Sequence, residues 1–266
     1  MNIIIGVSVP VDREVLRRLR LLRCLGLSWA ELGFFRGLNI SSSTLSTLRE
    51  VIHKFGLECS IHCPYFINFC SERLNVRERS LEIVLQCLEI CEVLNCELAV
   101  VHVGYYGPYG PSRCFEIVRN YFSKIINHVN ERGIRAKIAI ETMAKDSQFG
   151  TLDEVIKLCN EFTNYVVPCI DWAHIYVRYR GNLPFREVLH KIRESLPWLD
   201  FLHCHYTSVN DFEDYHVPVG KGPPDFKEVI DALKECNYFK KVIIVCESPL
   251  LERDAVKLLK IVRELS

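Results

Sequence analysis

Short runs of apolar residues, many of them β-branched, alternate along the chain with longer segments in which hydrophobic side chains recur at helical spacing. The short runs are typical of buried strands, and the longer segments are typical of amphipathic helices. Strands are expected at 3–9, 29–34, 58–63, 97–103, 136–141, 165–170, 199–205 and 241–247. Helices are expected at 14–25, 43–55, 72–94, 112–131, 152–162, 184–196, 225–235 and 252–265. Ser43 is the expected N-cap of the second helix.

Strands that are apolar almost throughout indicate a parallel sheet with both faces buried. Eight strand–helix units in 266 residues favour a closed (β/α)8 TIM barrel of the α/β class, with the active site at the C-terminal ends of the strands. The alternative is an open, doubly wound sheet, but no G-x-G-x-x-G motif follows the first strand. No linker or low-complexity segment interrupts the pattern, so residues 1–266 are expected to form a single domain.

Acidic and basic side chains balance, because Lys plus Arg and Asp plus Glu each number 33. A formally neutral chain has no general attraction for nucleic acid or for membrane surfaces, so any anion must be bound by local charge. No apolar run is long enough to span a bilayer, and no basic-then-apolar leader stands at the start. We therefore expect a soluble, cytoplasmic protein that is monomeric and has no membrane partner.

The chain has 13 cysteines, an odd number, and no C-x-x-C pair. Several of them fall inside expected strands or helices, where a thiol behaves as a small hydrophobic side chain. Mostly buried, reduced thiols are the favoured interpretation. Disulfides are the alternative if the source is a hyperthermophile, because such organisms do form them inside the cell.

Acidic and imidazole side chains gather where the expected strands end. Six of the nine histidines lie at strand ends or in the loops just beyond them, and four carboxylates accompany them. These residues are His62, His102, Glu141, Asp171, His174, His203, His205, Asp214, His216 and Glu247. Taken singly, each has a simple structural explanation; Asp171, for example, would cap the next helix. Together they would crowd one cavity that has few basic residues near it, and metal ions are the natural counter-charge.

The strand ends carry a series of motifs in a fixed order. They are His62-x-Pro64-Tyr65-x-x-Asn68, His102-x-Gly104, Glu141-Thr142, Asp171-x-x-His174, His203, Asp214-x-His216 followed by Gly220-Lys221-Gly222, and Glu247-x-Pro249. This series resembles the endonuclease IV family of apurinic/apyrimidinic (AP) endonucleases, in the xylose isomerase-like TIM-barrel superfamily. The resemblance implies three divalent metal ions, usually Zn²⁺, with Mn²⁺ as the other option.

Carried over to this sequence, the resemblance implies three ligand sets. The first is His62, His102 and Glu141; the second shares Glu141 and adds Asp171, His203 and Glu247; the third is His174, Asp214 and His216. The sequence departs from the family at His102-Val103-Gly104, where His-Pro-Gly is common, and at His203-Cys204-His205. His203 is favoured as the ligand from this last segment, and His205 is the alternative.

The activity that the resemblance implies is hydrolysis of a DNA phosphodiester on the 5′ side of an abasic site in double-stranded DNA. A metal-bound hydroxide would be the nucleophile, and Glu141 is the expected catalytic residue that orients it. The candidates for substrate binding are Tyr65, Asn68, Tyr105, Arg178 and Arg180, together with Tyr106 and Tyr109. Aromatic wedges and phosphate-binding arginines would suit a kinked duplex, although ordinary exposed turns would explain these loops as well.

Two other functions remain open. A sugar isomerase or epimerase of the same superfamily would use one metal ion, held at Glu141, Asp171, His203 and Glu247, and would move protons beside a carbonyl group. Such an enzyme has no need of the additional ligands in the first and third sets. A non-catalytic barrel that stores metal or binds a partner is the third interpretation, and complete ligand sets at an open barrel mouth argue against it.

Overall fold

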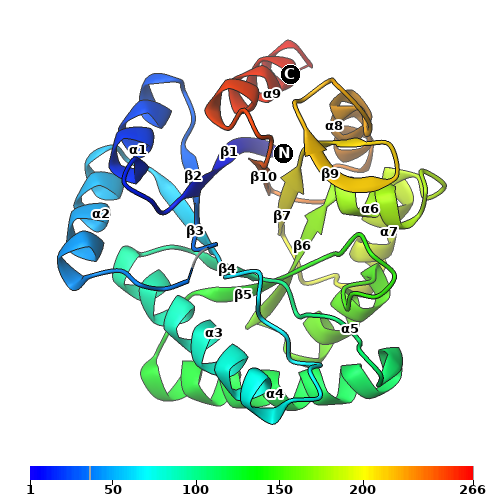
Figure 1. Cartoon of the computed structure of the whole chain (residues 1–266). Coiled ribbons are helices and arrows are strands. Elements are labelled where there is room, and N and C mark those ends of the chain that lie inside the picture. Colours follow the sequence, from blue (N-terminus) through cyan, green and yellow to red (C-terminus); the bar gives the residue numbers. More distant parts are fainter. Residues whose placement is uncertain (36, 266) are drawn as a thin grey trace.

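Eight parallel strands form a closed barrel in the computed structural model, which describes residues 1–35 and 37–265 (Figure 1). The strands are β1 (Asn2–Pro10), β2 (Trp29–Gly33), β3 (Glu58–His62), β4 (Leu98–Val101), β5 (Lys137–Glu141), β6 (Val166–Asp171), β7 (Phe201–Tyr206) and β10 (Lys241–Cys246). They follow the order β1-β10-β7-β6-β5-β4-β3-β2, so that β10 closes the barrel against β1. The predicted TIM barrel is confirmed.

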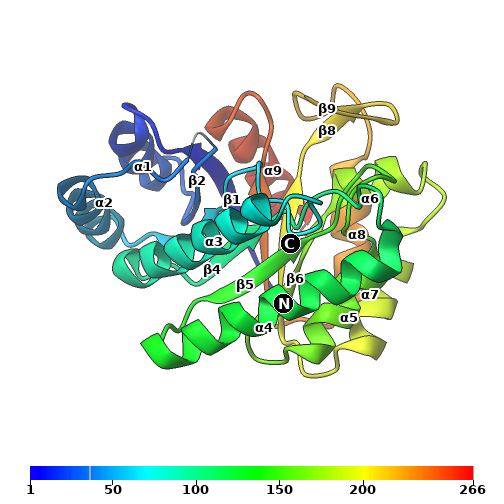
Figure 2. The same cartoon turned by 60° about the horizontal axis from the view of Figure 1, so that its bottom comes forward.

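Helices surround the barrel and cover the outer face of the sheet (Figure 1 and Figure 2). They are α1 (Val15–Cys24), α2 (Ser42–Lys54), α3 (Leu74–Leu94), α4 (Gly110–Arg132), α5 (Leu152–Glu161), α7 (Phe185–Ser195), α8 (Phe226–Cys236) and α9 (Glu252–Leu265). Successive strand residues point to opposite faces, and both faces are buried: Ile138, Ala139 and Ile140 are each at most 1% exposed. This double burial explains the apolar strands of the sequence. Across residues 1–35 and 37–265, no helix combines the length and the apolar character needed to cross a membrane.

Local signals fix several helix ends. The Oγ of Ser41 accepts the N–H of Thr44 at 3.1 Å, so Ser41 is the N-cap of α2 and the prediction of Ser43 is wrong. Thr151 forms a reciprocal capping box at the start of α5. Gly133 caps the C-terminal end of α4, and its φ of 64° is a left-handed conformation that glycine adopts without steric cost.

Two short elements lie in segments that the sequence pattern left as loops. The helix α6 (Trp172–Arg178) directly follows β6, and a hairpin of β8 (Ser208–Asn210) and β9 (Glu213–Val217) follows β7 and stands above the barrel in Figure 2. The chain packs tightly beside this hairpin at Gly222, where an added Cβ would lie 2.1 Å from the carbonyl oxygen of Val209. Only glycine fits there, which explains the last glycine of the Gly-Lys-Gly motif. The two elements carry His174, Asp214 and His216.

The cysteines follow the predicted pattern with one exception. Cys59, in β3, and Cys96, just before β4, form a disulfide near the N-terminal ends of these neighbouring strands. The other 11 cysteines are free, and most of them are buried. Burial raises the pKa of Cys91 and Cys169, so these thiols stay protonated and behave as core side chains.

Candidate metal centre

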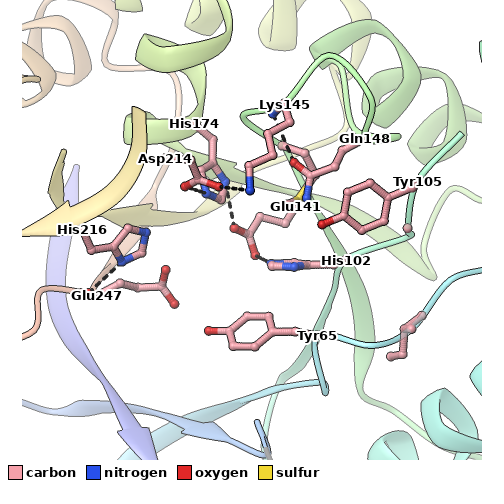
Figure 3. A pocket seen from close by; sticks show the side chains of 13 residues that line it. Tyr65, His102, Tyr105, Glu141, Lys145, Gln148, His174, Asp214, His216 and Glu247 are labelled. Carbon is pink, nitrogen blue, oxygen red and sulfur yellow. Dashed lines mark hydrogen bonds and ion pairs between the residues drawn. The ribbon is translucent and has the colours of Figure 1, made fainter. Parts of the chain in front are cut away.

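A cavity of about 270 Å³ opens at the C-terminal ends of the barrel strands. Its walls come from loops that are far apart in the sequence, and the labelled side chains of Figure 3 point into it. The lining residues are Tyr65, Ile67, His102, Gly104, Tyr105, Glu141, Met143, Lys145, Gln148, His174, Asp214, His216 and Glu247. The barrel thus brings predicted ligands from most strand ends to one place.

The first ligand set converges as predicted. His62 ends β3, His102 follows β4 and Glu141 ends β5, so three neighbouring strands each supply one group. The Nε2 atoms of His102 and His62 lie 2.8 Å and 3.3 Å from Glu141 Oε2. Two imidazoles and a carboxylate around one point are a donor set that zinc prefers.

The second set gathers three carboxylates and one histidine. Ligand atoms of Glu141, Asp171, Glu247 and His205 lie within 4.8 Å of one another. The pairing of β6 with β7 places His205 directly beside Asp171, whereas His203 lies two residues further down the barrel. The structure therefore puts His205, and not the predicted His203, in the second set.

The third set stands on α6 and the hairpin. His174 Nε2 lies 3.3 Å from Asp214 Oδ1, and ligand atoms of His174, Asp214 and His216 lie within 4.8 Å of one another. Asp214 and His216 share one face of β9 because strand residues two apart point the same way. Figure 3 shows the three side chains together at one side of the cavity.

Main-chain carbonyl groups orient several of these histidine rings. In three of them Nδ1 lies within 3.1 Å of a carbonyl oxygen. The pairs are His62 with Cys63, His174 with Thr142, and His216 with Glu247. An N–H at Nδ1 donates to each carbonyl, which turns a free Nε2 toward the ligand set.

Several oxygen and nitrogen atoms of the ligand sets are buried and have no hydrogen-bond partner in the part of the chain that the structure describes, so they are available to coordinate divalent cations. Among the described residues, Glu141 Oε1, Asp171 Oδ2 and His205 Nδ1 have no hydrogen-bond partner. Burial raises the pKa of Asp171. Burial alone would also raise the pKa of Glu141, but the neighbouring His102 and His205 outweigh it and hold that pKa well below its usual range. Unpaired buried carboxylates are costly, so a bound cation would relieve this centre.

Sequence comparison places the chain in a family of barrels. A family model described as a xylose isomerase-like TIM barrel matches residues 19–265. The chain belongs to the xylose isomerase-like TIM barrel family. Uncharacterized protein MJ0133 of Methanocaldococcus jannaschii is 29% identical over 270 residues, covering 98% of this chain and 96% of that protein. Probable endonuclease 4 of Sulfurihydrogenibium sp. is 26% identical over 217 residues, 75% of each chain, and confirms the resemblance drawn from the motifs.

Solved structures that share this fold include a sugar epimerase-like protein and an endonuclease. A D-tagatose 3-epimerase-like protein aligns with a TM-score of 0.78 and 23% identity over 99% of this chain and 96% of its own. Endonuclease IV from Thermus thermophilus aligns with a TM-score of 0.70 and 18% identity over 99% of this chain and 98% of its own. Identities this low establish a common fold alone, so the side chains of the cavity must decide between functions.

One buried acid of the family barrel was not among the predicted site residues. Glu31, in β2, is completely buried, and its Oε1 and Oε2 lie 2.8 Å and 2.9 Å from Nε2 of His205 and His203. The sequence did contain a signal, a single acid within the apolar run 29–34. An acid in a strand that is buried on both faces must have a partner, and that argument would have found it.

The predicted substrate-binding residues of the β3 and β4 loops have different roles. Tyr65 and Tyr105 line the cavity and are 47% and 44% exposed, so they are available to a ligand. Asn68 instead joins the two loops: its Oδ1 accepts the N–H of Cys70 at 3.0 Å within the β3 loop and the N–H of Tyr105 at 3.4 Å from the β4 loop. An added Cβ on Gly104 would lie 2.4 Å from that Oδ1, which is why the β4 motif needs glycine. Asn68 therefore positions the loops and does not line the cavity.

Neither predicted arginine lines the cavity. The guanidinium of Arg178 donates to the carbonyl oxygens of Met143, Lys145 and Gln148 at 2.8, 3.0 and 3.2 Å. These bonds order the loop after β5, so Arg178 is not free to bind a phosphate as predicted. Arg180 is exposed just beyond the end of α6.

The loops around the cavity contain one basic group that the sequence did not single out. Lys145 lines the cavity, and its Nζ lies 3.6 Å from Asp214 Oδ2 (Figure 3). The hydroxyl groups of Tyr106 and Tyr109 bond instead to side chains of α5 and α3. The candidate contacts for a substrate are therefore Lys145, Tyr65 and Tyr105.

Proposed function

We propose that this protein is a metal-dependent AP endonuclease that hydrolyses the DNA phosphodiester on the 5′ side of an abasic site. Three divalent cations would occupy the three ligand sets, and Zn²⁺ is the best match to mixed imidazole and carboxylate donors. The third set carries the proposal, because His174, Asp214 and His216 converge beside the first two sets on one cavity. A one-metal enzyme has no use for this set.

Glu141 is the residue around which the chemistry would be organised. Its Oε2 faces His62 and His102, while its Oε1 lies 3.1 Å from His174 Nδ1, so the carboxylate spans the space between the ligand sets. The bound metals would supply a lowered water pKa and neutralise charge on the departing oxygen. Glu141 stays ionised, because the nearby histidines lower its pKa despite burial, and it would orient the attacking water by a hydrogen bond.

The surroundings of the cavity suit a nucleic acid. Lys145 stands beside the third set, where its ammonium group can contact a phosphate oxygen. Five aromatic side chains on the loops and on the β8–β9 hairpin are exposed: Tyr65, Phe66, Tyr105, Phe212 and Tyr215. Exposed rings can stack on bases or hold a kinked duplex open. Because the chain as a whole is neutral, affinity for abasic double-stranded DNA would depend on these groups and on the metals.

A one-metal sugar epimerase is the second candidate. The second set alone can hold one cation, and carboxylates beside it can move a proton next to a carbonyl group. The similarity in fold to a D-tagatose 3-epimerase-like protein supports this candidate. The third set would then be an ordinary cluster in which His174 and Asp214 form an ion pair.

Metal content and incision, measured together, distinguish the two candidates. The zinc-loaded protein is freed of loosely bound metal, analysed for zinc, and incubated with a duplex that contains one abasic site and, separately, with ketohexoses. We expect about three zinc ions per chain and a single nick 5′ to the site. Glu141→Gln should abolish the nick while the protein still melts cooperatively. One ion per chain, epimerised sugar and an intact duplex would contradict the proposal.

A further inference from the structure

Glu31 is held rigidly beneath the second ligand set. Trp29 Nε1 donates to Ser60 Oγ at 3.0 Å, and Ser60 Oγ donates to Glu31 Oε2 at 2.7 Å. The same Oε2 lies 2.9 Å from His203 Nε2. Oε1 lies 2.8 Å from His205 Nε2, in an ion-pair contact whose angle is too oblique for a regular hydrogen bond. All five side chains belong to residues that are 0% exposed. Because Trp29 donates to the Ser60 oxygen, the Ser60 proton is directed at Glu31.

The ring of His205 presents a different nitrogen to its ligand set than the histidines whose Nδ1 is bonded to a main-chain carbonyl group. Those rings direct Nε2 to their ligand sets, whereas His205 directs Nδ1, which lies 3.4 Å from Glu141 Oε2 and 3.7 Å from Glu247 Oε1. Its Nε2 points back to Glu31. Glu31 thus stands where the other rings have a carbonyl oxygen.

We propose that Glu31 is the positioning residue of the second ligand set, which holds the protonated Nε2 of His205 and leaves the lone pair of Nδ1 directed at the metal. A ring that carried its proton on Nδ1 could not act as a ligand there. A carboxylate behind a ligand histidine fixes the tautomer and makes the ring a stronger donor. The inference rests on the proposed metal centre, and it applies to an endonuclease and to an epimerase alike.

A glutamine cannot replace Glu31 in this role. A carboxylate only accepts hydrogen bonds, so it suits the hydroxyl and the two imidazoles that surround it. In Glu31→Gln, the donation from Ser60 would keep the amide oxygen at the Oε2 position. The amide NH₂ would then face His205 Nε2, which would have to accept a hydrogen bond and carry its proton on Nδ1, the side of the metal.

Zinc competition with a coloured chelator tests the inference. In Glu31→Gln we expect one bound ion to weaken by about 10- to 100-fold, the others to keep their affinity, and full occupancy to return at high zinc. When Co²⁺ replaces zinc, the absorption of the ion in the second ligand set should change, and the absorption of the other ions should not. Unchanged affinity and spectrum would overturn the inference. Complete loss of one ion at saturating zinc would also overturn it, because Glu31 would then itself be a ligand.

Two further variants keep the test decisive. His203→Gln removes the other imidazole partner of Glu31 and should leave every zinc affinity unchanged; a loss equal to that of Glu31→Gln would contradict the assignment to His205. If Glu31→Gln does not fold, Ser60→Ala loosens the carboxylate while keeping its charge, and it should weaken the same ion by a smaller factor. Wild-type affinity in that variant would count against the inference.

None of these measurements uses DNA, so a protein that never nicks an abasic duplex can still show the dependence on Glu31.

Discussion

Asp171 accepts the backbone N–H of His174 at 2.7 Å through Oδ1, while Oδ2 has no hydrogen-bond partner among the described residues. One carboxylate therefore caps α6 and turns its second oxygen toward the second ligand set. The cap also fixes where α6 begins, and so it places His174 for the third set. Helix capping and metal ligation, which compete as explanations of this motif in the sequence, are compatible in a single side chain.

Asp171→Asn should separate the two roles of Asp171. Asparagine caps a helix as well as aspartate does, so the metal-free protein should keep its stability, whereas Asp171→Ala should lose about 1 kcal/mol. Both variants should lose tight binding at the second set, because each lacks the carboxylate. Urea unfolding of the metal-free proteins and zinc analysis of the loaded ones measure the two effects. Full zinc content in Asp171→Asn would mean that Asp171 is a cap alone.

The choice between His203 and His205 shows where the sequence stops being informative. Side chains two residues apart on a strand share a face, so the two histidines look alike in any pattern of alternation. What distinguishes them is depth in the barrel, and depth follows from the pairing of β7 with β6. Glu31 was missed for a related reason, since its partners lie on a strand far away in the sequence.

The barrel itself was predictable, because each of its helices is long enough to show a hydrophobic period and the strands are mostly apolar. The elements that escaped were α6 and the β8–β9 hairpin, which are too short to show a period and depend on packing at the barrel mouth. These elements carry the third ligand set. The sequence therefore identified the ligand residues of this set by their type, but it did not predict the short helix and the hairpin that carry them.

His216→Ala should remove one metal ion and leave the other two. His216 belongs only to the third set, so zinc content should fall by about one ion per chain, and incision of an abasic duplex should fall by at least roughly 100-fold. Tyr215→Ala is the matched control for zinc content alone, because Tyr215 is 67% exposed on the same strand and belongs to no ligand set. If both variants keep full zinc content and activity, the third set is not a metal site.

Arg178→Met should destabilise the protein without changing its metal content. The guanidinium donates three hydrogen bonds to carbonyl groups of the loop after β5, and methionine replaces none of them. We expect a loss of about 2 kcal/mol in unfolding free energy, whereas Arg180→Met, at an exposed position, should stay within about 0.5 kcal/mol. An unchanged stability in Arg178→Met, combined with weaker DNA binding, would restore the role in substrate binding that the sequence predicted.

Lys145→Ala should raise KM for an abasic duplex and leave zinc content intact. Lys145 contacts Asp214, but its ammonium group cannot bind a metal ion. Its loss therefore removes positive charge from the cavity wall and leaves every metal ligand in place. We expect KM to rise roughly tenfold, the value of one charge-assisted contact, and Lys145→Arg to recover most of it. A change in kcat with KM unaltered would show that Lys145 acts on the reaction and not on binding.

Removing the metals should destabilise the protein by an amount that depends on the concentration of free zinc. The centre buries Glu141 and Asp171 close together, and the cations that would neutralise them bind only the folded chain. At free zinc about a thousandfold above Kd, this binding contributes roughly 4 kcal/mol, so a chelator should lower Tm by roughly 10 °C. Added Zn²⁺ should restore Tm, whereas Mg²⁺, which prefers oxygen ligands in an octahedral arrangement, should not. Glu141→Gln removes the carboxylate shared by two sets, and its Tm should respond less to the chelator. A Tm that is the same with and without chelator would contradict a metal centre at this position.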